Sequence, residues 1–135
     1  MTAPALPAKS NIDGAKLEAA LGVKGTAKDG MFKLVMGRKA NASCGCPVGK
    51  FMGVNTWSAF AGSDDTAVVD GDFAMLESEL QPVLKALRGA GINIVAIHQH
   101  MAMESPRVMF LHYWGVGPTR ALATGLQAAL ATQHR

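Results

Sequence analysis

Three of the four histidines lie within fifteen residues of one another, at positions 98, 100 and 112. Glu104 lies between the second and the third, so the pattern reads His-x-His-x-x-x-Glu…His. Three neutral imidazoles and one carboxylate suit zinc, copper, iron, manganese or nickel better than calcium or magnesium. The sequence therefore predicts a transition-metal site formed by His98, His100, Glu104 and His112, with zinc or copper as the expected ion.

Strand geometry explains how the histidines could share one ion. Side chains alternate between the two faces of a strand, so His98 and His100 point to the same side, with Cα atoms about 6.5–7 Å apart. Two rings at that spacing can converge on an ion about 2.0–2.1 Å from each nitrogen. If the expected strands 92–100 and 107–114 form a hairpin, His112 reaches the same face.

The cluster leaves three functional interpretations open. A closed set of four ligands would indicate a metal-binding protein without turnover. An open coordination position would indicate a metal-dependent enzyme, a hydrolase or an oxidoreductase that activates water or oxygen. Histidines that only donate and accept hydrogen bonds would indicate a module that binds a small ligand or a partner, or a purely structural role.

Charged residues beside the cluster could support it. Four acids gather where the expected strand 66–73 gives way to a helix: Asp70, Asp72, Glu77 and Glu79. Acids at a helix N-terminus are stabilised by the helix dipole, which is their default role. One of them could instead act as a general base beside the metal. Glu77 and Arg107 are the candidates to contact the ligands or an anionic substrate.

A second chemical motif is Cys44-Gly45-Cys46, in a loop expected over 37–53. Loops this long in a compact domain are usually functional or mobile. Two neighbouring thiolates can bind a soft ion such as Cu(I) or Zn. They can also close a disulfide, whose small ring is strained and easily reduced. Cys44 and Cys46 are thus a candidate redox or soft-metal pair, and two ordinary loop cysteines are the alternative.

Composition limits the class of protein. The chain has 135 residues, of which 49% are hydrophobic and 17% charged, which fits one globular domain and excludes a disordered chain. The net charge of +3 comes from dispersed basic residues without interleaved aromatics, which argues against nucleic-acid binding. No apolar run approaches the roughly 20 residues of a membrane span. The expected partners are a metal ion and, in the ligand-binding interpretation, a small molecule.

Turn signals and hydrophobic periodicity predict one α+β domain over 11–135, after a disordered leader over 1–10. Helices are expected from a cap at Asn11 or Asp13 to Gly22, over 77–88 and over 119–132. Strands are expected over 31–36, 54–61, 66–73, 92–100 and 107–114, with a hairpin turn at 62–65 and a polar turn at 24–30. This order predicts a two-layer sandwich, a mostly antiparallel sheet with helices on one face.

Three segments, 71–83, 91–100 and 104–117, resemble the LppY/LpqO-type family, with the pattern His-x-His…Glu-Ser-Pro-Arg-Val…His. This family comprises bacterial, often exported proteins and lipoproteins, and it is classed as a domain of unknown function. The resemblance implies a periplasmic or otherwise exported protein whose signal peptide has been removed, with its site at the histidines. It implies no reaction. Together, these features predict an exported bacterial transition-metal-binding protein.

Overall fold

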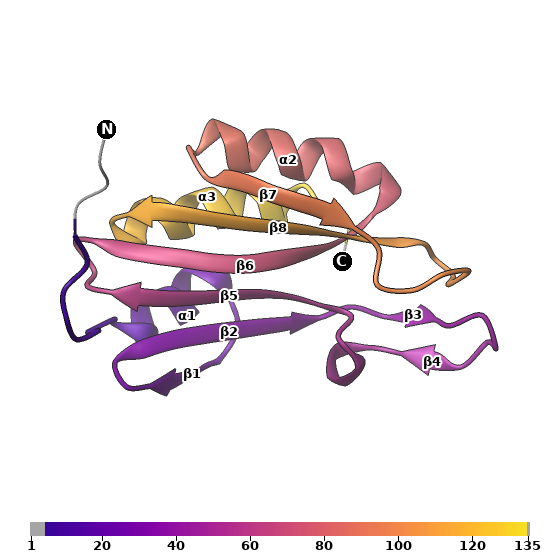
Figure 1. Ribbon diagram of the computed structural model, residues 1–135, viewed down its shortest axis with the longest axis horizontal. Coiled ribbons are helices and arrows are strands. Elements are labelled where there is room, and N and C mark those ends of the chain that lie inside the picture. Colours follow the sequence, from indigo (N-terminus) through magenta and orange to yellow (C-terminus); the bar gives the residue numbers. More distant parts are fainter. Residues whose placement is uncertain (1–4, 135) are drawn as a thin grey trace.

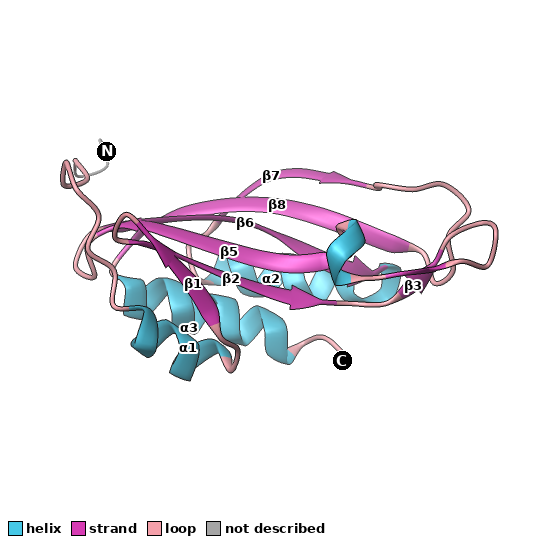
Figure 2. Cartoon of the chain, turned by 90° about the horizontal axis from the view of Figure 1, so that it is seen from below, coloured by secondary structure: helices cyan, strands magenta, loops and turns pink. Residues whose placement is uncertain are grey.

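The computed structural model describes residues 5–134 and has two layers, a sheet and a set of helices (Figures 1 and 2). The strands of the main sheet are β1 (Gly25–Lys28), β2 (Met31–Gly37), β5 (Asn55–Gly62), β6 (Ala67–Leu76), β7 (Asn93–His98) and β8 (Val108–Gly117). The helices are α1 (Gly14–Leu21), α2 (Leu80–Gly89) and α3 (Thr119–Ala131). The strand order is β1-β2-β5-β6-β8-β7 and every pairing is antiparallel. The predicted α+β sandwich is confirmed.

The three helices cover one face of the sheet, as Figure 2 shows from below. Strand β2 alternates between buried and exposed positions, and Phe32 and Leu34 point toward the helices. Val83 and Leu87 of α2 are fully buried in the same core. Each such side chain contributes about 1.5–3 kcal/mol of stability by leaving water. No helix within residues 5–134 is long and apolar enough to cross a membrane.

Several elements differ from the sequence prediction. The strand predicted over 92–100 ends at His98, so His100 lies in the following connection and strand parity does not place it. The segment predicted as a polar turn at 24–30 contains the edge strand β1, whose residues are mostly exposed and therefore show no apolar alternation. The predicted loop 37–53 contains the short strands β3 (Ala40–Asn41) and β4 (Pro47–Val48) and the 3₁₀ turn η1 (Lys50–Met52). Strands of two residues are too short to leave a periodic signal. Residues 1–4 of the predicted leader lie outside the described residues.

A smaller apolar cluster lies on the sheet face away from the helices. Its buried residues are Ala40, Val54, Ala74, Val108 and Phe110, with Val48 and Met101 packed against them. Backbone hydrogen bonds from Asn41 N to Ser105 O (2.7 Å) and from Ser105 N to Asn41 O (2.8 Å) join β3 to the connection between β7 and β8. The β3–β4 hairpin and the loop after His98 therefore pack as one unit.

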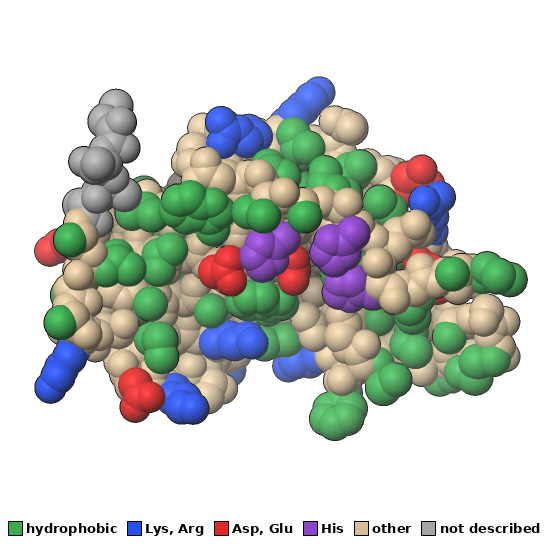
Figure 3. Space-filling model, viewed as in Figure 1, with side chains coloured by type: hydrophobic (Ala, Val, Ile, Leu, Met, Phe, Trp, Pro, Cys, Tyr) green, Lys and Arg blue, Asp and Glu red, His purple; other side chains and the backbone are tan. Residues whose placement is uncertain are grey.

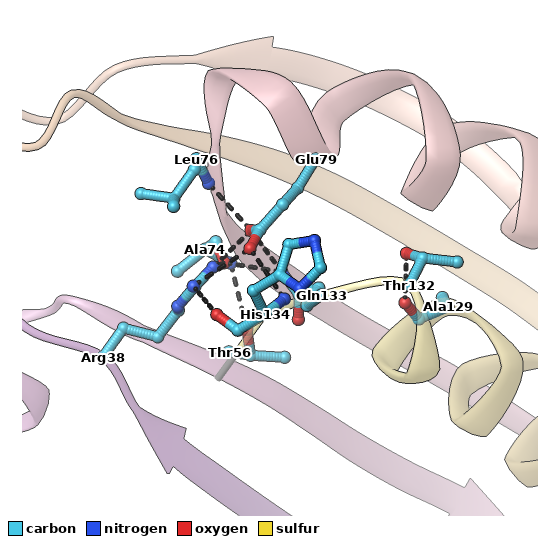
Figure 4. A network of polar contacts seen from close by, with 9 residues as sticks. All are labelled: Arg38, Thr56, Ala74, Leu76, Glu79, Ala129, Thr132, Gln133 and His134. Atoms are coloured by element: carbon cyan, nitrogen blue, oxygen red, sulfur yellow. Dashed lines mark hydrogen bonds and ion pairs between the residues drawn. The ribbon is translucent and has the colours of Figure 1, made fainter.

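A buried ion pair fastens the C-terminal end of the chain to the sheet (Figure 4). The Glu79 side chain, 2% exposed, accepts hydrogen bonds from the Arg38 guanidinium and from the backbone N–H of Leu76 (2.9 Å). It also accepts from Gln133 Nε2 (3.2 Å) and from the backbone N–H of His134 (3.1 Å). Burial by itself would raise the pKa of Glu79, but these donors, Arg38 first, hold that pKa below its usual range.

We expect Glu79→Gln to lower the free energy of unfolding by about 3–5 kcal/mol, because it leaves the Arg38 charge buried without its partner. The urea midpoint measures this loss. Glu77→Gln is the matched control, since Glu77 is exposed in the same turn, η2 (Glu77–Glu79), and should change stability by less than about 0.5 kcal/mol. Equal midpoints for the two variants would contradict the role of the ion pair.

The same variant should show a defined pH dependence. A lowered pKa in the folded state means that the ion pair stabilises the protein above the unfolded-state pKa of about 4.3, and that this stabilisation is lost as pH falls through the folded-state pKa. The stability difference between the wild type and Glu79→Gln should therefore shrink in acid. A difference that grows in acid would be inconsistent with the lowered pKa.

Candidate functional site

The sheet face away from the helices, here called the open face, carries the three clustered histidines (Figure 3). Strands β7 and β8 form the predicted hairpin, with Ala96 opposite His112 and His98 opposite Phe110. On its other side, β8 pairs with β6, which puts Asp72 opposite His112. His98 and His112 therefore occupy neighbouring positions on one face, with two carboxylates of β6 beside them.

His112 is held between two aspartates. Its Nδ1 lies 2.9 Å from Asp72 Oδ1 and its Nε2 lies 2.9 Å from Asp70 Oδ1. Trp57 Nε1 donates to the other oxygen of Asp72 at 3.1 Å, and Lys33 Nζ lies 4.6 Å from the centroid of the Trp57 ring. These contacts make a polar line across the open face from β2 to β8.

The two aspartates favour the protonated form of His112. Burial by itself would lower the pKa of His112, but the hydrogen bonds and charges of Asp72, and then of Asp70, outweigh it and raise that pKa. A protonated imidazole donates from both nitrogens, which matches one carboxylate at each of them. His112 in this arrangement is a clamp between Asp70 and Asp72, and neither of its ring nitrogens is free.

His98 and His100 form a separate, exposed pair. Their ring centroids are 5.0 Å apart, and the His100 ring lies flat on Phe110, with centroids 3.5 Å apart and an angle of 4°. Desolvation, followed by the charge of His98, lowers the pKa of His100, and the charge of Asp72 partly opposes this. Asp72 thus acts on both His100 and His112. Within residues 5–134, no hydrogen bond engages the ring nitrogens of His98 or His100.

The other predicted site residues have different surroundings. Glu104 is buried, and its Oε1 accepts a hydrogen bond from the backbone N–H of Val108 at 3.2 Å. Arg107 Nη2 donates to Gln99 Oε1 at 3.2 Å, and Glu77 is exposed at the start of η2, beyond the end of β6. Among the described residues, no group of three His, Cys, Asp or Glu side chains is arranged to hold a metal ion.

The carboxylates nearest the histidines are therefore Asp70 and Asp72, which the sequence interpretation had placed at a helix N-terminus. That default role is wrong for these two, because β6 continues to Leu76, but it holds for Glu79, which accepts the Leu76 N–H. The signal for Asp70 and Asp72 was their i, i+2 spacing in a strand, which puts both side chains on one face. Nothing in the sequence indicated that Trp57 would join them.

Gly71 lets the strand carrying both aspartates lie close to its neighbour. A Cβ on Gly71 would stand 2.1 Å from Trp57 O and 2.4 Å from the hydroxyl of Tyr113, so a larger residue is excluded. The buried Tyr113 hydroxyl uses this space to donate to Trp57 O (3.0 Å), and it lies 2.6 Å from Ser58 Oγ. The Tyr113 hydroxyl, on the core side of the sheet, thus holds the backbone of Trp57, whose side chain belongs to the polar line on the open face.

Cys44 and Cys46 are joined by a disulfide in the turn between β3 and β4, and both residues are exposed. The backbone N–H of Cys46 donates to Cys44 Sγ at 3.3 Å. The pair lies on the hairpin that is bonded to Ser105 in the loop between β7 and β8.

A family model described as Domain of Unknown Function (DUF1259) matches residues 15–132, and the chain belongs to this family. The matched region includes the three clustered histidines, the aspartates of β6 and the cysteine pair. Comparison with curated proteins and with solved structures gives no significant match.

We expect Asp72→Asn to lower the pKa of His112, because it removes the first of the two carboxylates that favour the imidazolium. NMR titration of the imidazole protons measures this pKa, which should lie above the ordinary 6.5 in the wild type. Asp65→Asn, in the exposed turn between β5 and β6, is the matched control and should leave the His112 titration unchanged.

A raised folded-state pKa also sets the direction of the effect on stability. The His112 clamp stabilises the fold below the unfolded-state pKa of about 6.5, and this contribution is lost as pH rises through the folded-state pKa. Asp72→Asn should therefore destabilise the protein more at pH 6 than at pH 9, by on the order of 1 kcal/mol for a partly exposed pair. The opposite order would contradict an imidazolium at this position.

Proposed function

We propose that the protein binds a transition-metal ion on the open face, with His98 and His100 as its primary ligands and the Asp72 carboxylate beside them. The observation that carries this proposal is the exposed pair of imidazoles, whose nitrogens are unengaged within the described residues. A metal ligand must be deprotonated, and the lowered pKa of His100 favours the neutral form of that ring.

The surroundings of the pair favour a bound ion in two ways. Exposed side chains change rotamer within nanoseconds, so two rings with centroids 5.0 Å apart can turn their nitrogens toward a common ion. Asp72 supplies negative charge next to His100, and its hydrogen bonds to Trp57 and His112 hold it in place. Metal-binding carboxylates are typically fixed by such contacts.

The proposal assigns roles within the predicted ligand set that differ from the sequence prediction. Asp72 takes the place that Glu104 had in the sequence prediction, because Glu104 is buried and bonded to the backbone. His112 orients Asp72 and becomes a third ligand only if it releases one of its aspartates. Imidazole and carboxylate ligands are compatible with zinc and copper, the two expected ions.

A second candidate is a module that binds a small polar ligand without metal. The absence of a three-ligand arrangement among residues 5–134 favours it, as does the aromatic surface beside the acids. Trp114, 41% exposed, lies opposite Asp70 in the register and shares the open face with Trp57. Aromatic rings next to fixed carboxylates form a surface that can contact and orient a small molecule.

We also propose that the chain is of the LppY/LpqO type within its family and functions outside the cytoplasm of a bacterium. The Cys44–Cys46 disulfide supports the exported location, because disulfides persist in oxidising compartments such as the periplasm.

The test is metal titration by calorimetry, with Zn²⁺ and Cu²⁺ in turn, on the oxidised protein so that no thiolate competes. We expect one ion per wild-type chain, none in the double variant His98→Ala/His100→Ala, and affinity about 10- to 100-fold weaker in Asp72→Asn. His134→Ala is the matched control, since only backbone atoms of His134 bond to Arg38 and Glu79. Full binding by the double variant would place the site elsewhere, and no binding by the wild type would favour the second candidate.

A further inference from the structure

The Cys44–Cys46 disulfide is placed where another protein can reach it. It closes the turn of the β3–β4 hairpin, which extends beyond the main sheet in Figure 1. Both cysteines are exposed, and among the described residues outside 44–46 no atom lies within 4 Å of the position that a Cβ on Gly45 would occupy. No other described segment therefore covers the Gly45 side of the turn.

The disulfide is not needed to hold the hairpin together. Disulfides stabilise mainly by closing long loops, and this one encloses a single residue. The hairpin is already held by the pairings of Ala40 with Val48 and Asn41 with Pro47, and by the two backbone bonds between Asn41 and Ser105. A chemical role explains the pair better than a structural one.

The two sulfur atoms are not equivalent. The backbone N–H of Cys46 donates to Cys44 Sγ, so a thiolate formed at Cys44 already has a hydrogen-bond donor in place. The segment 37–53 around it contains no acidic residue, so no carboxylate of this segment opposes a thiolate at Cys44. Donors and cations lower the pKa of a thiol, and a thiol of lower pKa is the better leaving group in disulfide exchange.

We propose that Cys44–Cys46 is a thiol–disulfide exchange centre that oxidises a pair of exposed cysteines in another protein. One substrate thiolate attacks Cys46 Sγ, the S–S bond breaks, and Cys44 leaves with the electron pair as a thiolate. The second substrate thiolate then attacks the substrate sulfur of the mixed disulfide and displaces Cys46. The substrate loses two electrons and two protons and gains one S–S bond, while Cys44 and Cys46 become the dithiol. This activity is independent of the metal site.

The first test mixes the oxidised protein with a reduced dithiol peptide under anaerobic conditions and follows both by mass spectrometry. We expect about one equivalent of peptide disulfide per protein. In a separate series of glutathione buffers of increasing reducing strength, we expect the Cys44–Cys46 disulfide to become half reduced within the series. The variant Cys44→Ser/Cys46→Ser should leave the peptide reduced while keeping the wild-type melting temperature within a few degrees. A disulfide that stays oxidised throughout the series, or a peptide that stays reduced, would overturn the proposal.

The second test separates the two sulfurs by their rates of alkylation with iodoacetamide at pH 7. Cys46→Ser keeps the backbone N–H that faces Cys44, so the single thiol of this variant should react several-fold faster than that of Cys44→Ser. After incubation with oxidised glutathione, Cys44→Ser should carry the mixed disulfide on Cys46, the position where the substrate attacks. Equal alkylation rates in the two variants would remove Cys44 as the leaving group and refute the assigned direction of attack.

Discussion

The antiparallel pairing of β6 with β8 is the constraint on which both the core and the candidate site depend. Its register runs without a break from Ala67 opposite Gly117 to Leu76 opposite Val108. One face of this ribbon carries Phe73, Leu111 and Tyr113 into the core under the helices. The other face brings Asp72 to His112. Because side chains alternate along a strand, a slip of one residue would bury the charged residues and expose the aromatic ones, so burial of the core also fixes the register of the site.

Two histidines on the open face, His112 and His100, have pKa values shifted in opposite directions. Asp72 and Asp70 raise the pKa of His112, whereas desolvation and the charge of His98 lower the pKa of His100. Asp72 acts on both rings: it hydrogen-bonds to His112, and its charge raises the pKa of His100 against the other influences. A bound cation would therefore enter a site whose carboxylate is already ordered. Trp57 Nε1 and His112 Nδ1 hold that carboxylate, one at each of its oxygens.

A second region of chemistry is connected to the first through packing. The β3–β4 hairpin that carries the disulfide is bonded at Asn41 to Ser105, and the small cluster around Val108 and Phe110 packs beneath both segments. Phe110 is also the residue on which His100 stacks. The disulfide turn and the histidine pair are thus positioned by the same few apolar residues, although their proposed chemistries are separate.

The sequence by itself determined most elements and the parity of the histidines. The apolar stripe of α2, the turn at 62–65 and the alternation in β2 are properties of single segments. His98 and His100 do lie side by side, but β7 ends at His98, so strand parity alone does not explain their pairing. Strand neighbours are different, because they depend on which distant segments bury each other. Only the tertiary structure therefore decided that β1 joins the sheet, that Asp70 and Asp72 flank His112, and that Glu104 turns inward to Val108. The Arg38–Glu79 pair shows the same limit, since local periodicity carries no information about which buried charges meet across the fold.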